Sequence, residues 1–172
     1  YGLSKKFNED LSNVFFKLYK IETVNLRFSN VYGEYSFHKK SFIHNCIKNI
    51  LSNKKTKIFG DGKQTRDFIY VQDLVKLIYR SFKLNHGSYN IASGKSFSVN
   101  QILNIMINIK KNLKYMYTKK NLTEVKDVKI SNSKIKKILK LKNNFFTPLN
   151  KGINKTLVWY QKNHLSLIKH KQ

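Results

Sequence analysis

Cysteine is nearly absent from this sequence of 172 residues, which contains only Cys46. No disulfide can therefore form within the chain, and a disulfide-stapled scaffold is excluded. Cys46 lies in an apolar segment at residues 42–50, where we expect it to be a small buried hydrophobe. A single cysteine is typical of proteins in a reducing compartment, so we expect a cytoplasmic protein.

Long apolar runs and clusters of metal ligands are also missing. No segment approaches the ~20 apolar residues of a membrane-spanning helix, so we expect no membrane partner. The five histidines lack nearby acidic or cysteine residues in the pattern of a metal site, so no metal is expected. A hydrophobic content of 41% is nonetheless enough to build a core, and the length suits one domain or parts of two.

Acidic residues are scarce as well: the chain has 9 of them and 34 basic residues, which gives a net charge of +25. A chain this basic could bind nucleic acid. Three of the 34 basic residues are arginines, which leaves 31 lysines, and these are spread from Lys5 to Lys171 instead of clustering. We therefore interpret the charge as a general preference for anionic ligands and expect no nucleic-acid partner.

The chain begins with a tyrosine and a lysine four residues apart, Tyr1 and Lys5. On a helix, positions i and i+4 lie one above the other, so a phenol would lie beside an ammonium. A cation about 4 Å away stabilises a phenolate by roughly 4 kcal/mol at an effective dielectric near 20, enough to make a tyrosine a general acid or base near neutral pH. The same spacing also occurs in ordinary surface pairs, so the pair alone does not decide between the two.

The hydrophobic pattern predicts alternating helices and strands. Helices are predicted over residues 1–19, 42–52, 74–83, 99–109 and 132–140, and from residue 148 onward. Extended segments are predicted at residues 22–28, 57–59, 68–71, 88–92 and 114–118. The predicted helix caps are Ser41, Asp73, Ser98 with Gln101, and Ser131. The buried stripe predicted for the first helix consists of Leu3, Phe7, Leu11, Val14, Phe15 and Leu18.

Three further segments follow the Tyr-Lys pair in a definite order. They are Ser29-Asn30-Val31-Tyr32-Gly33, the stretch Gly60-Asp61-Gly62-Lys63-Gln64-Thr65-Arg66-Asp67-Phe68, and Tyr89-Asn90-Ile91-Ala92-Ser93-Gly94. In this order and spacing the chain resembles the extended short-chain dehydrogenase/reductase family. The resemblance is to NAD-dependent nucleotide-sugar epimerases and dehydratases of the UDP-glucose 4-epimerase type, and it runs from Tyr1 to about residue 163.

This resemblance implies an α/β fold, with the C-terminal part of a Rossmann-like NAD-binding domain and a smaller α+β domain for the nucleotide sugar. The NAD-binding domain would contain residues 1–34 and 64–84. The substrate-binding domain would contain residues 35–63 and 85–165, and a basic tail would follow at residues 166–172. Members of the family carry a glycine-rich phosphate loop, and the Ser/Thr that assists the tyrosine, upstream of the position that Tyr1 matches. We therefore expect this chain to be a C-terminal fragment, inactive alone, whose helices have apolar faces with nothing to cover them.

The resemblance also implies roles for individual residues. Tyr1 would be the catalytic acid and base, and Lys5 would stabilise its phenolate; both would contact NAD. Phe28 and Val31 would wall the nicotinamide pocket. The residues expected to hold the UDP-sugar substrate are Asn30, Phe59, Arg66 and Glu124.

Three of these substrate-binding assignments have local alternatives. Arg66 has a planar fork of donors that suits a diphosphate, which is the interpretation we favour; the alternative is an ion pair with Asp61 or Asp67. Asn30 could be a turn residue that satisfies its own backbone, and Phe59 could be a plain core residue.

The sequence departs from the family pattern at one nucleotide contact, because Asn121 stands where an arginine is expected. The expected reaction is epimerisation at C4 of a UDP-hexose by transient hydride transfer, in a homodimer formed through the first helix. The alternatives are a nucleotide-sugar 4,6-dehydratase and a non-catalytic nucleotide-binding fragment.

Overall fold

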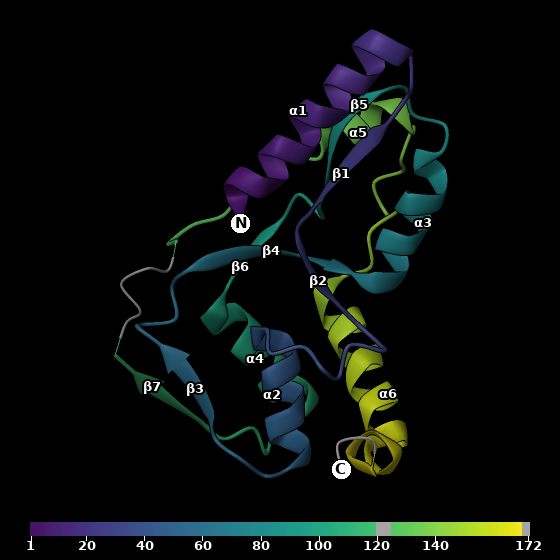
Figure 1. Cartoon of the computed structure of the whole chain (residues 1–172). Coiled ribbons are helices and arrows are strands. Elements are labelled where there is room, and N and C mark those ends of the chain that lie inside the picture. Colours follow the sequence, from purple (N-terminus) through teal and green to yellow (C-terminus); the bar gives the residue numbers. More distant parts are fainter. Residues whose placement is uncertain (120–124, 170–172) are drawn as a thin grey trace.

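The computed structural model describes residues 1–119 and 125–169, with side chains described up to residue 163 (Figure 1). Its helices are α1 (Gly2–Tyr19), α2 (Phe42–Leu51), α3 (Val71–Ser81), α4 (Val99–Ile109), α5 (Ser133–Ile138) and α6 (Leu149–Lys169). Its strands are β1 (Val24–Phe28), β2 (Asn30–Tyr32), β3 (Thr56–Phe59), β4 (Thr65–Tyr70), β5 (Gly87–Ile91), β6 (Ser96–Ser98) and β7 (Tyr115–Thr118). No helix within these ranges has the length and apolar character that crossing a bilayer requires.

The strands form three small and mainly parallel sheets. β1 pairs with β5 and β3 pairs with β7, both in parallel. β4 lies between β2, to which it is parallel, and β6, to which it is antiparallel. In Figure 1, β4 crosses the middle of the molecule, with α1, β1, β5 and α5 above it and α2, β3 and β7 below it. The predicted α/β fold is confirmed.

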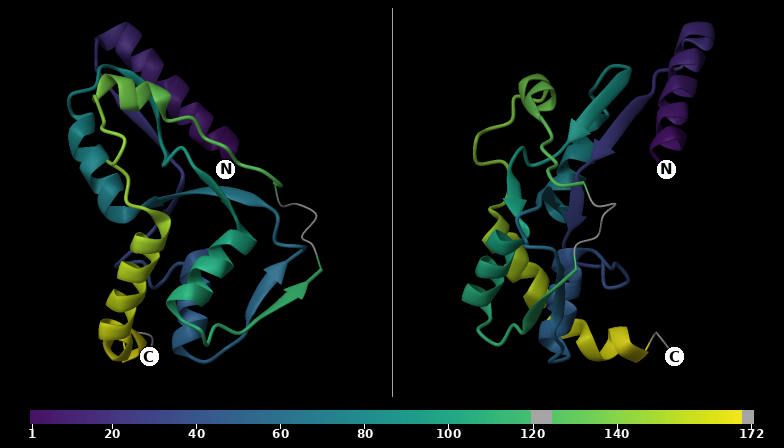
Figure 2. Two further views of the ribbon diagram at one scale, coloured as in Figure 1. Left: turned by 180° about the vertical axis from the view of Figure 1, so that it is seen from behind. Right: turned by 90° about the vertical axis from the view of Figure 1, so that its left-hand side faces the viewer.

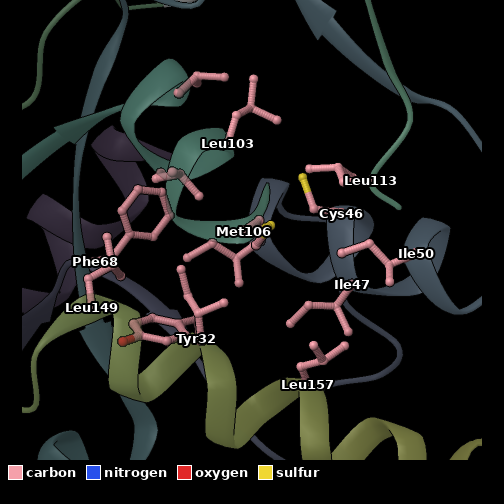
Figure 3. Close-up of a cluster of buried hydrophobic side chains, with 14 of the residues drawn as sticks. Tyr32, Cys46, Ile47, Ile50, Phe68, Leu103, Met106, Leu113, Leu149 and Leu157 are labelled. Carbon is pink, nitrogen blue, oxygen red and sulfur yellow. The ribbon is translucent and has the colours of Figure 1, made fainter. Parts of the chain in front are cut away.

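The larger hydrophobic core is built mainly by α2, α4 and α6, and Figure 3 shows part of it. Cys46 of α2 is 0% exposed in this core, so its prediction as a small buried hydrophobe is confirmed, and burial raises the pKa of its thiol to about 12. α6 contributes a buried apolar stripe to this core, which consists of Leu149, Ile153, Leu157 and Tyr160.

A second, smaller core joins α3, β5 and α5. Its centre consists of Ile69, Leu77, Ile91 and Ile135, which are at most 1% exposed. β5 lies in the range 85–165 that was expected to bind the substrate, and in the structure it pairs with β1 along its whole length. The division of the chain into two domains stays a prediction.

The first helix differs most from what its sequence pattern predicts. The helix itself is present as α1, but the prediction that its apolar stripe is buried is wrong, because α1 contains no buried residue. Figure 2 shows the reason: α1 stands on one side of the β1–β5 pair, with its outer face free of other elements, while α5 lies on the opposite side. The exposed stripe consists of Leu3, Phe7, Leu11, Val14, Phe15 and Leu18, between 41% and 88% exposed. The expectation of an uncovered apolar helix face is therefore confirmed.

The helix caps follow the sequence only in part. The capping box of α4 is confirmed, because Ser98 Oγ accepts from Gln101 N at 3.1 Å and Gln101 Oε1 accepts from Ser98 N at 2.8 Å. Ser41 precedes α2 as predicted, but its hydroxyl contacts the ring of His44 instead of the helix backbone. Residue 132, not the predicted Ser131, is the N-cap of α5.

Asp73 was also predicted as a cap, and this prediction is wrong. It lies inside the first turn of α3, whose N-cap is Tyr70. Its carboxylate is almost completely buried and accepts hydrogen bonds from the backbone N–H and the hydroxyl of Thr147, at 2.6 and 3.0 Å. Asp73 therefore ties α3 to the segment that leads into α6, a contact between residues far apart in the sequence.

Asp67, in the middle of β4, makes a second long-range link of this kind. Its carboxylate is 0% exposed and accepts from the backbone N–H groups of Ser93 and Gly94, at 2.9 and 2.8 Å. Gly94 has a positive φ of 76°, a conformation that favours glycine. Asp67 thus anchors the turn after β5 to β4, next to Arg66.

Candidate functional site

Tyr1 and Lys5 lie together at the open end of α1. Tyr1 is the N-cap position, and its carbonyl accepts from Lys5 N at 3.1 Å and from Ser4 Oγ at 2.8 Å. The Lys5 ammonium lies over the Tyr1 ring, 5.4 Å from the ring centroid. Tyr1 is 96% exposed, so its phenol is accessible to a ligand. The helical spacing predicted from the sequence therefore does bring the two side chains into contact.

A cavity of about 640 Å³ lies between this end of α1 and strand β1. We call it the Tyr1 cavity; the predicted site residues Tyr1, Lys5 and Phe28 line it, together with Glu9, Asn25 and Arg27. Phe28 is the last residue of β1 and is 48% exposed, so part of its ring is open to the cavity. The carboxyl end of a strand is where ligands bind in open α/β sheets.

A second cavity, of about 450 Å³, brings together three of the residues predicted to hold a nucleotide sugar. These are Asn30 at the start of β2, Phe59 at the end of β3 and Arg66 in β4, and we call the cavity the Arg66 cavity. Asn30 and Arg66, which are 36 residues apart in the sequence, thus meet because β2 and β4 are neighbours in one sheet. Phe59 is 50% exposed, so it is not the plain core residue of the alternative interpretation.

Arg66 is held by backbone acceptors on two segments. Its Nη1 donates to the carbonyl of Thr65 at 2.8 Å and to the carbonyl of Lys126 at 3.2 Å. Asp67, one of its two proposed ion-pair partners, has its carboxylate engaged by the turn at residues 93–94. These bonds orient the guanidinium at the wall of the cavity, where a planar set of donors can meet an anion.

Asn30 is oriented by strand β4. Its side-chain Nδ2 donates to the carbonyl of Asp67 at 3.0 Å, so the amide is fixed by a neighbouring strand and not by its own turn. The side-chain oxygen is an acceptor on the cavity wall. Val31, by contrast, packs against the second core, and Glu124 lies outside the described residues.

Two lysines of the Arg66 cavity were not singled out from the sequence. Lys40 and Lys57 line it and are both exposed. Lys40 reaches the cavity from the segment that precedes α2. With Arg66 they place three positive charges around one cavity, a setting that favours an anionic ligand. The sequence offered no signal for them, because lysines occur throughout the chain.

No group of three or more His, Cys, Asp or Glu side chains forms a metal site within residues 1–119 and 125–163. The chemistry available in the two cavities is therefore that of a phenol beside an ammonium and of a cationic anion-binding wall.

Comparison with known proteins identifies relatives of this chain by sequence. Residues 1–92 match the model of the NAD dependent epimerase/dehydratase family. A putative UDP-glucose 4-epimerase of Methanocaldococcus jannaschii is 42% identical over 62% of this chain and 35% of its own length. A UDP-glucuronate 4-epimerase of Thermodesulfobacterium geofontis is 34% identical over 98% of this chain and 52% of its own length.

The fold is also shared with a solved structure, the UDP-glucuronic acid 4-epimerase of Bacillus cereus in complex with UDP-glucuronic acid and NAD. The TM-score is 0.84 and the sequence identity 26%, over 94% of this chain and 52% of that one. The chain thus spans about half the length, or less, of the relatives that it matches. Because the family model covers more than half of the chain, and the long relative nearly all of it, this chain belongs to the NAD dependent epimerase/dehydratase family.

Proposed function

We propose that the protein containing this chain epimerises a nucleotide sugar at C4, with a UDP-hexose as the substrate and Tyr1 as the acid and base. The observation that carries this proposal is the separation of two cavities with different chemistry. The Tyr1 cavity offers an exposed phenol next to an ammonium, and the Arg66 cavity offers a cationic wall. Both relatives reported above are 4-epimerases of UDP-sugars by name.

The residues of the Tyr1 cavity fit the nicotinamide riboside portion of NAD. The Lys5 ammonium has three donors for sugar hydroxyls, and the half-exposed Phe28 ring offers an apolar surface to a planar ring. Tyr1, Lys5 and Phe28 would hold this portion, and Val31 stays a contact predicted from the family resemblance. NAD, when bound, supplies a reversible acceptor for the hydride of the sugar carbon.

Tyr1 would transfer the proton. Its phenolate takes the proton of the sugar 4-hydroxyl and returns it when the C4–H bond is restored on the opposite face. The positive charge of Lys5, which lies over the Tyr1 ring, stabilises the phenolate during this exchange. A phenol that is 96% exposed in this chain can reach a substrate hydroxyl without rearrangement of α1.

The Arg66 cavity would hold the nucleotide end of the same substrate. Arg66 would bind the diphosphate, and Asn30 would donate from Nδ2 to a phosphate oxygen or accept with Oδ1 from a sugar hydroxyl. Phe59 would pack against the base, and Lys40 and Lys57 would add positive charge at the cavity mouth. Glu124 is retained as the predicted acceptor for a ribose hydroxyl.

Replacing Arg66 with alanine should weaken UDP binding by about 10- to 100-fold, because a charge-assisted hydrogen bond to phosphate contributes about 1.5–3 kcal/mol. Isothermal titration of UDP into the protein measures the change. Arg66→Lys should recover only part of the affinity, since an ammonium lacks the planar fork.

Lys83→Ala is the matched control for charge, because it removes one exposed positive charge outside both cavities. Its UDP affinity should equal that of the unmodified protein. Equal affinity in Arg66→Ala and in the unmodified protein would remove Arg66 from the substrate site.

The exposed face of α1 supports a second part of the proposal, a homodimer formed through this helix. Phe7 and Leu11 are 65% and 42% exposed on neighbouring turns, and a second copy of the helix would cover them. Replacing both with serine should convert a dimer to a monomer in light scattering, whereas Lys17→Ser on the same helix should leave the dimer intact. A monomeric unmodified protein, or a dimeric double variant, would contradict the proposal.

A 4,6-dehydratase is the second candidate, because the matching family model covers both reactions. The two are separated by their products: epimerisation conserves the mass of the nucleotide sugar, whereas dehydration removes one water. Mass spectrometry of the reaction mixture distinguishes them. A non-catalytic nucleotide-binding role would show UDP binding that depends on Arg66, without either product.

A further inference from the structure

The side of α1 that faces the rest of the chain is polar. Four of its residues contact β1, β5 or the segment between α3 and β5, at the spacing i, i+3, i+4 and i+7 of one helix face. These residues are Glu9, Ser12, Asn13 and Phe16. With about 100° of rotation per residue, Glu9 lies roughly 40° around the helix from Lys5 and 80° from Tyr1, so the attached face is also the Tyr1–Lys5 face.

Glu9 makes the most extensive of these contacts. Arg27 of β1 donates to both of its carboxylate oxygens, from Nε at 2.7 Å and from Nη2. Ser88 of β5 donates to the same carboxylate at 3.2 Å. Because β1 and β5 are paired strands, a single carboxylate attaches α1 to both of them. The hydrogen bonds from Arg27 also hold the pKa of Glu9 below its ordinary value, so it is a carboxylate at neutral pH.

The position of this pair relative to the proposed chemistry is specific. Glu9 lies one helical turn after Lys5, and Arg27 directly precedes Phe28 at the end of β1. Both members of the pair line the Tyr1 cavity. The pair therefore connects the turn that carries the acid and base to the strand end on which the cofactor ring would pack.

We propose that the Glu9–Arg27 pair is a positioning device that holds the Tyr1–Lys5 turn at a set rotation and height against the end of β1. The inference rests on the proposed function. The pair acts through Tyr1 and Lys5 and touches no reacting atom. An apolar face would hold the helix less specifically, because hydrophobic packing has no directional preference, whereas a two-pronged guanidinium–carboxylate pair does.

The test is the kinetics of nucleotide-sugar epimerisation by Glu9→Gln, which keeps the size of the side chain but weakens the paired contact. We expect kcat to fall roughly 10- to 100-fold, the range for a catalytic group displaced by about 1 Å, while UDP affinity at the Arg66 cavity stays unchanged. A purely structural role would lower the melting temperature and leave the kcat of the folded protein unchanged.

Two further variants test whether the loss of kcat is specific to the Glu9–Arg27 pair. Asp10→Asn is the matched control, because the described partner of Asp10 is Lys6 on α1 itself, and this change should leave kcat unaltered. The double variant Glu9→Arg with Arg27→Glu reverses the pair and should recover part of the kcat lost by either single change.

Each outcome is decisive. A Glu9→Gln variant with the kcat of the unmodified protein, or a loss equal to that of Asp10→Asn, overturns the positioning role alone. An unmodified protein that converts no nucleotide sugar overturns the proposed function and this inference with it.

Discussion

Replacing Tyr1 with phenylalanine should lower kcat for nucleotide-sugar epimerisation by about 10²- to 10⁴-fold, the usual contribution of a positioned general acid or base. The change removes only the hydroxyl, so the ring that lies under the Lys5 ammonium is retained. UDP affinity should not change, because Tyr1 does not line the Arg66 cavity. Conversion of UDP-galactose to UDP-glucose, followed in single-turnover and steady-state assays, measures the effect.

The matched control lies at the other end of the same helix. Tyr19 is 64% exposed and outside both cavities, so Tyr19→Phe should retain the full kcat. If Tyr1→Phe also retains it, Tyr1 is not the acid and base, and the proton must be carried by a group in another part of the protein.

Lowering the pH from 7 to 4 should destabilise the protein by roughly 3 kcal/mol through His44 alone. His44 is 0% exposed in the larger core, and burial, reinforced by the positive charges of Lys39 and Lys48, lowers its pKa from 6.5 to about 4. Between these two pH values the unfolded state binds a proton that the folded state does not. Stability is therefore complete above pH 6.5 and falls as the pH decreases toward 4.

Urea denaturation at several pH values measures this loss. In His44→Asn the amide can replace the ring nitrogen that contacts the Ser41 hydroxyl at 2.6 Å, and it does not titrate. The part of the pH dependence between 6.5 and 4 that belongs to His44 should disappear in this variant. His38→Asn, a change at an exposed loop histidine, should keep it. An unchanged pH profile in His44→Asn would show that the pKa of His44 does not differ between the folded and unfolded states, and would contradict the prediction.

Much of the fold was predictable because it depends on short stretches of sequence. Apolar residues at helical spacing correctly predicted the elements now seen as α1, α2, α4 and α6. The capping box of Ser98 and Gln101 was predictable for the same reason, since both partners lie within one turn. Strands β2 and β6 were not predicted, because each has three residues and is held only by its pairing with β4.

The candidate site also has a part that the sequence predicted and a part that it did not. The contact between Tyr1 and Lys5 follows from a spacing of four residues, and the family resemblance selected Asn30, Phe59 and Arg66, which meet in one cavity. The two lysines at that cavity could not be selected, because a side chain's distance from Arg66 depends on tertiary packing that the local pattern does not describe.

What the sequence by itself determined is therefore the helices and the longer strands, the family and the turn that carries Tyr1 and Lys5. Only the tertiary structure decided which face of α1 is attached: the apolar stripe that predicted burial is exposed, and the polar face of Glu9 is fastened to Arg27, 18 residues away. The physical reason is that helical periodicity shows that two faces differ, while the face that meets the sheet is set by the partners that the remaining chain brings to it. For α1 those partners are a guanidinium on β1 and a hydroxyl on β5.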